Sequence, residues 1–155
     1  MSTSTNDPHT ALRRQLALRH YFIGWIALLL FLSLGAFLEA LHAFKVGFYL
    51  DPTAKLRREM WTLAHAHGAL LALIQLAFAA GLMQFGRWTA ERLKLVSFFL
   101  IDAAVLIPLG FFLGGLSPSE SDPSMGVYLV PLGALLLFVA VALILLSSGL
   151  PPDEK

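Results

Sequence analysis

The stretch YFIGWIALLLFLSLGAFLEALHAF, residues 21–44, decides the fold class that this sequence predicts. Its side chains are mostly apolar, and Glu39 and His42, near its end, are the charged or imidazole-bearing exceptions. A helix needs about 20 apolar residues to cross the hydrocarbon core of a bilayer. Because lipid offers no hydrogen-bond partners, such a segment must satisfy its own backbone polar groups, which favours a helix. The stretch therefore predicts a membrane-spanning α-helix.

Three more apolar runs of similar length follow this stretch. They cover residues 61–85, 95–116 and 127–147. The loops between the runs are short, and short loops make successive helices antiparallel neighbours. We therefore expect an all-α fold, an integral membrane four-helix antiparallel bundle over residues 20–148. A polar N-terminal tail of residues 1–19 precedes it, and a C-terminal tail of residues 149–155 follows it.

The composition supports the same class. Of the 155 residues, 57% are hydrophobic and 14% are charged, whereas soluble domains carry about a quarter charged residues. We therefore expect the lipid bilayer to be the main partner, and a net charge of +1 without a basic patch argues against nucleic acid. The sequence contains no cysteine, which excludes disulfides, iron–sulfur clusters and c-type haem attachment.

The distribution of lysine and arginine predicts the orientation of the chain. One side of the expected bundle would carry seven of these residues, in the N-terminal tail, the second loop and the C-terminal tail. They are Arg13, Arg14, Arg19, Arg87, Arg92, Lys94 and Lys155. The other side would carry four, which are Lys45, Lys55, Arg57 and Arg58. The positive-inside rule then favours a multi-pass protein of the bacterial inner membrane with both termini in the cytoplasm.

Four side chains of ligand type are expected at one level of the bundle. Glu39 and His42 share a face near the end of the first run, and LAHAHGALL, residues 63–71, brings in His65 and His67 where the second run begins. An antiparallel hairpin places all four at a similar depth. Ionisable groups at membrane depth cost about 2.5–3.5 kcal/mol on insertion scales, so they often mark sites.

The spacing of the two histidines predicts two separate contacts. At about 100° per residue, His65 and His67 point about 160° apart. We expect one to meet Glu39 and His42, and the other to reach the third or fourth helix near Tyr128. The arc between the two histidines predicts a close-packed seam, because small residues let helices approach closely in membranes. The seam consists of Ala64, Gly68, Ala72, Gln75 and Ala79.

Three interpretations of these polar residues stay open. In the first, Glu39 pairs with a histidine and the cluster only fixes helix packing, since buried polar groups are nearly always hydrogen-bonded. In the second, His42, His65 and His67 bind haem b or copper, with Glu39 as a further metal ligand, because imidazole is a common ligand for both.

The third interpretation is proton or ion handling. Asp102 of the third run and Gln75 of the second would then be members of a proton relay. Four helices leave little room for a transporter unless copies of the chain associate. Motifs of hydrolases and phosphate-binding loops are missing from the sequence, which favours a protein without catalytic activity.

The segment TLAHAHGALLALIQLAFAAGL, residues 62–82, resembles the second transmembrane helix of the catalytic subunit of haem–copper oxidases. There a histidine in an Ala-His-Gly context ligates the low-spin haem. The resemblance implies that His67, which precedes Gly68, is a haem ligand and that His42 completes a bis-histidine pair. That subunit has many more helices, and its later histidines have no counterpart here, so oxygen reduction is not implied. The segment also resembles small, uncharacterised four-helix bacterial membrane proteins with a His-x-His second helix.

Two functions follow as expectations. The first is a haem- or metal-binding membrane protein with a redox, sensing or respiratory-accessory role. The alternative is a non-catalytic structural or assembly subunit of a membrane complex. In both, the expected protein partner is another membrane subunit or a second copy of the chain.

Overall fold

The computed structural model describes residues 8–85, 88–119 and 122–147, and all regular structure in these ranges is helical. The four long helices are α1 (Pro8–Ala43), α3 (Lys55–Gln84), α4 (Ala90–Gly114) and α5 (Leu129–Ser147). The short helical turns are α2 (Gly47–Leu50), η1 (Pro52–Ala54) and η2 (Met125–Tyr128). Each long helix, with the short turn before it where one adjoins, is long and apolar enough to cross a membrane. The predicted helical class and the four apolar helices are confirmed.

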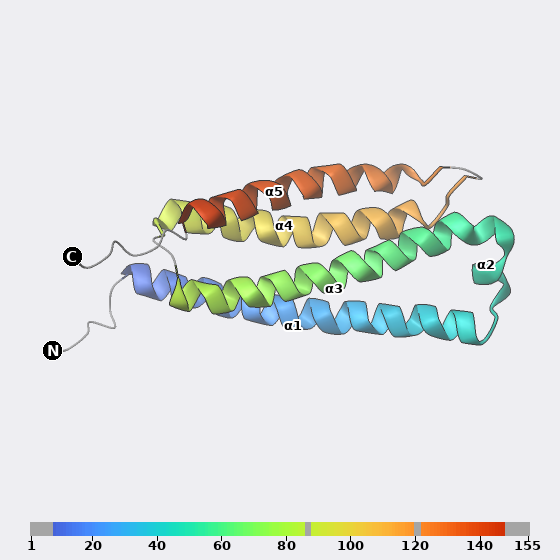
Figure 1. Cartoon of the computed structure of the whole chain (residues 1–155), viewed down its shortest axis with the longest axis horizontal. Coiled ribbons are helices and arrows are strands. Elements are labelled where there is room, and N and C mark those ends of the chain that lie inside the picture. The colour runs from blue at the N-terminus through green and yellow to red at the C-terminus, as the bar shows by residue number, and fades with distance from the viewer. Residues whose placement is uncertain (1–7, 86–87, 120–121, 148–155) are drawn as a thin grey trace.

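The helices form two side-by-side pairs joined through α3 and α4 (Figure 1). Helix α1 packs along α3, and α4 packs along α5. Within the described ranges no Cα atom of α1 lies within 8 Å of a Cα atom of α5, so these two helices form the outer edges of the arrangement. The short helix α2 lies at the end of the molecule opposite to the one at which α1 begins.

The first helix is longer than the sequence predicted. It begins at Pro8, so residues 8–19, which we expected in a polar tail, form its first turns. Proline is well accepted at such a position because the first helical N–H groups have no intrahelical partner. Leu16 and Ala17 are buried against α3 and α4, and Arg13 Nε donates to the Leu82 carbonyl at 3.0 Å. The alanine, leucine, arginine and glutamine residues of the segment also favour a helix, so its polar side chains do not prevent one.

The loop after α1 is also more ordered than its sequence suggests. Helix α3 begins at Lys55, six residues before the apolar run that predicted it. Asp51 caps the turn before it, since its Oδ1 accepts from the Thr53 amide at 2.8 Å. Arg58 Nη1 donates to the carbonyls of Tyr49 and Asp51 at 2.6 and 2.9 Å. The basic residue thus ties the loop to α3.

The predicted small-residue seam is the buried face of α3. All five of its members, Ala64, Gly68, Ala72, Gln75 and Ala79, are buried. Leu70 and Leu73, on the opposite arc, are each more than half exposed. The seam faces α1, where the Phe31 ring lies so close to Gly68 that a Cβ there would be 2.3 Å from it. The close packing of α1 and α3 therefore depends on the absence of a side chain at Gly68.

The main apolar core lies toward the end of the molecule where α1 begins and α5 ends (Figure 1). All four long helices contribute to it. Its buried members are Leu16, Ala17, Phe78, Leu82, Leu93, Val96, Leu100 and Ala140. A smaller cluster of Leu38, Leu41 and Tyr49 lies near α2.

Candidate functional site

Three of the four predicted ligand residues line one cavity near α2. Glu39 and His42 of α1, Tyr49 of α2, and Thr62 and His65 of α3 contribute to this space of about 320 Å³. Glu39 and His42 are exposed, while His65 is half-buried. The hairpin of the first two long helices thus brings an acidic side chain and two imidazoles to one level.

His65 is fixed against α1 by a hydrogen bond and by close packing. Its Nδ1 lies 2.6 Å from the Phe31 carbonyl oxygen. A carbonyl only accepts, so Nδ1 carries the proton and donates, and Nε2 of the neutral ring keeps its lone pair. The ring lies over Gly35, where a Cβ would be 2.4 Å from its Cε1. Gly35, one turn after Phe31, leaves the room through which the imidazole reaches that carbonyl.

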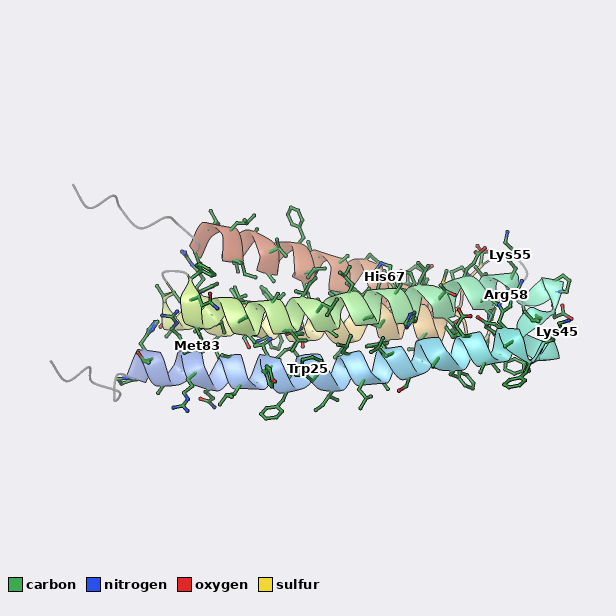
Figure 2. The ribbon with its side chains drawn as sticks, turned by 60° about the horizontal axis from the view of Figure 1, so that its bottom comes forward. Trp25, Lys45, Lys55, Arg58, His67 and Met83 are labelled. Carbon is green, nitrogen blue, oxygen red and sulfur yellow. The ribbon has the colours of Figure 1, made fainter. Side chains whose placement is uncertain are left out.

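His67 contacts a different helix. Its ring centroid lies 4.8 Å from that of Phe111 on α4, and its Nδ1 donates to the Leu63 carbonyl at 2.9 Å. Figure 2 shows His67 on the side of α3 away from α1. The prediction that the two imidazoles lean toward different helices is confirmed. The contact partner on the far side is Phe111, where Tyr128 was expected.

The predicted ligands do not converge on a single ion. Among residues 8–85, 88–119 and 122–147, no group of three or more histidine, aspartate and glutamate side chains lies close enough to hold a metal. His65 and His67 face α1 and α4 respectively. A set that contains both could therefore not share one metal in this arrangement.

A second polar cluster lies deep in the bundle, and it joins three helices. His20 of α1, Gln75 of α3 and Ser97 of α4 are almost completely buried. His20 Nδ1 is hydrogen-bonded to Gln75 Oε1, and its Nε2 lies 2.8 Å from Ser97 Oγ. Gln75 Nε2 donates to the Leu100 carbonyl at 2.8 Å. We call His20, Gln75 and Ser97 the three-helix lock.

The directions of the hydrogen bonds in the three-helix lock can be worked out from the Leu100 carbonyl, to which Gln75 is bonded. The Leu100 carbonyl only accepts, so the amide nitrogen of Gln75 must face it and Oε1 must face His20. His20 Nδ1–H then donates to Oε1. In the neutral imidazole Nε2 carries no proton, so it accepts from the Ser97 hydroxyl. Both imidazole nitrogens are occupied. His20 has no free lone pair for a metal or a haem.

Sequence reasoning missed His20 because it lies one residue before the first apolar run, beside Arg19. The available signal was helical spacing, since Leu16, His20 and Gly24 recur every fourth residue and are all buried. In one of the three interpretations, Gln75 and Asp102 were members of a proton relay. In the structure the Gln75 amide is hydrogen-bonded to His20 and Leu100, and Asp102 is half-buried on α4.

No family model, no curated protein and no solved structure matches this chain.

Proposed function

We propose that this chain is a multi-pass integral membrane protein of a bacterial inner membrane, an antiparallel four-helix bundle with cytoplasmic termini. The outer surfaces of α1 and α5 support this proposal. In the most apolar window of each, only 11% of the residues are buried. Phe22, Leu29, Phe138 and Leu145 are each more than 60% exposed. Contiguous apolar surface of this extent is rare on a soluble protein and suits contact with lipid.

Within that membrane, the chain acts as a non-catalytic structural or assembly subunit of a larger complex. The three-helix lock is the observation that carries this proposal. Lipid tails are as apolar as leucine, so burial of apolar residues does not drive helices together, and close packing and hydrogen bonds decide their arrangement. Here the deepest polar side chains are used for bonds between helices. They hold α1, α3 and α4 together, and the outer faces of α1 and α5 stay available to another subunit.

The mass and the visible spectrum of the protein as it is purified test this function. In mild detergent we expect a protein mass above the 16.9 kDa of one chain, together with a visible spectrum free of a Soret band. A single chain without a partner subunit or second copy would contradict the proposed assembly role. Haem or copper in stoichiometric amount would favour the second candidate instead.

That second candidate is a haem b or copper site in the cavity of Glu39, His42 and His65, serving a redox, sensing or respiratory-accessory role. One observation favours it. His65 Nδ1–H is held by a backbone carbonyl, which is the usual way in which metal-binding histidines are oriented, and Nε2 keeps its lone pair. Since no three histidine, aspartate or glutamate side chains of the described residues lie close enough to hold a metal, another chain or solvent would supply the remaining ligands.

Two variants of α3, His65→Ala and His67→Ala, distinguish the ligand-binding function from the structural one. The purified protein is mixed with haem b, or with Cu²⁺, and binding is followed by absorbance. If the cavity is a ligand site, His65→Ala abolishes binding and His67→Ala, whose ring faces α4, leaves it unchanged. Equal loss in both variants, or no binding by the unmodified protein, would rule out this site.

A further inference from the structure

A second cavity, separate from the histidine sites, lies on the outer surface between α1 and α3. It is a groove of about 490 Å³ near the end of the molecule where α1 begins. Its lining is Arg14, Ala17, Leu18, Tyr21, Trp25, Leu76, Ala79, Ala80 and Met83. Figure 2 shows Met83 near this end and Trp25 farther along α1. Arg14 is the one charged residue in that lining.

The groove extends along α1 from Arg14 to a pair of aromatic rings. Arg14 and Trp25 are eleven residues apart on α1, and a helix rises about 1.5 Å per residue, so the groove extends for roughly 16 Å. Tyr21 and Trp25 are about half exposed, and their ring centroids lie 6.2 Å apart. Such rings are enriched where lipid headgroups meet acyl chains.

The charge at the end of the groove is not paired with a carboxylate in the part of the chain that the structure describes. Within the described ranges the ion pair is between Lys55 and Glu59, at the far end of the molecule, so Arg14 has no carboxylate partner there. Its neighbour Arg13 is already hydrogen-bonded to the Leu82 carbonyl. A guanidinium binds phosphate oxygens well because its donors match their geometry. Arg14 is therefore available to a phosphate at the level where a lipid headgroup would lie.

We propose that this groove binds one anionic glycerophospholipid, with its phosphate on Arg14 and one acyl chain between α1 and α3. The proposal rests on the proposed insertion of the chain into a membrane. Anionic lipids in the cytoplasmic leaflet are attracted to basic residues near its surface, and the groove lies at the end that also carries Arg13, Arg19, Arg92 and Lys94.

Native mass spectrometry of the full chain tests this proposal. The protein is equilibrated in micelles that contain equal amounts of phosphatidylglycerol and phosphatidylcholine, and the lipid retained on the protein is counted. We expect about a fivefold preference for phosphatidylglycerol, as one surface charge would give. Arg14→Gln should remove the preference, and Arg14→Lys should keep most of it. Ala80→Phe, which fills the groove, should lower the retention of both lipids.

Arg19→Gln is the matched control. Arg19 is exposed on the same helix and does not line the groove, so this variant should keep the preference. Equal retention of the two lipids by the unmodified protein would overturn the proposal, as would equal effects of Arg14→Gln and Arg19→Gln. A second copy of the chain, lost in Ala80→Phe, would show that the groove is a protein interface. Cysteine labelling (Discussion) tests membrane insertion separately, so failure of either proposal is recognisable.

Discussion

His20 lies in the interior of the molecule with both ring nitrogens hydrogen-bonded, beside an arginine and one residue before a long apolar run. Its position shows how a single polar residue can join three helices. Gln75 orients the ring because its own amide is fixed by the Leu100 carbonyl. Ser97 then supplies the hydroxyl that Nε2 needs. Removal of one member leaves a buried polar atom of another member without its partner, which is costly.

The hydroxyl of Ser97 is the simplest member to remove. Ser97→Ala should lower the free energy of unfolding in micelles by about 1–3 kcal/mol, because Nε2 of buried His20 loses its donor. Ser33→Ala is the control, since Ser33 Oγ is exposed and donates to the Leu29 carbonyl of its own helix at 2.8 Å. Denaturant titration followed by circular dichroism measures both variants. Equal small losses would mean that the bond to His20 contributes nothing.

At the scale of the elements, the contact of α1 with α3 depends on side chains that lie over glycines. Phe31 of α1 covers Gly68, and His65 of α3 covers Gly35. Each helix therefore presents a ring to the backbone of the other. This exchange sets a close approach that larger residues would prevent.

Gly35→Ala tests this packing. The new Cβ would lie 2.4 Å from the His65 ring, which the bond to Phe31 holds in place. We expect the free energy of unfolding to fall by about 1–3 kcal/mol, as for other overpacked sites. Gly81→Ala is the control on α3, because a Cβ there meets nothing within 4 Å and alanine is the better helix former. A loss in Gly81→Ala as large as that in Gly35→Ala would contradict the packing argument.

The loop before α3 carries a pH-dependent cap. The Thr53 hydroxyl and then its amide donate to Asp51, and these bonds hold the pKa of that carboxyl below its ordinary value. A lowered pKa means that the cap is present at neutral pH and is lost as the pH falls through the folded-state pKa. Thr53→Val should raise the pKa of Asp51, as an NMR titration of its carboxyl would show. An unchanged pKa would mean that the hydroxyl does not contribute.

The helices could be predicted from the sequence more fully than their contacts could. Apolar runs are a local signal, so all four long helices and the seam of α3 were found. The start of α1 was not, because residues 8–19 lie outside the apolar run that predicted the helix. Their alanine, leucine, arginine and glutamine residues favour a helix, and Leu16 and Ala17 are buried in the core. For the same reason the His20–Gln75 pair, 55 residues apart, was missed. His65 and His67 were correctly predicted to point in two directions, because the angle between them depends only on the geometry of their own helix.

At the scale of the whole molecule, the orientation in the membrane is the first proposal to test. The chain has no cysteine. Labelling of a single introduced cysteine therefore shows on which side of the membrane that position lies. Lys55→Cys and Lys94→Cys change exposed residues. In intact spheroplasts, an impermeant maleimide should label Lys55→Cys directly and Lys94→Cys only after lysis. The reverse pattern would invert the proposed topology, and labelling of both in intact spheroplasts would contradict a spanning bundle.

The central claim is that buried polar side chains fix the packing of the helices. A double-mutant cycle of His20→Leu and Gln75→Leu, measured as the free energy of unfolding in micelles, tests it most directly. We expect the two changes to be less than additive, with a coupling of about 0.6 kcal/mol, the average found for hydrogen bonds between membrane helices, and at most about 1.7 kcal/mol. Strictly additive losses, with no coupling between His20 and Gln75, would contradict the claim.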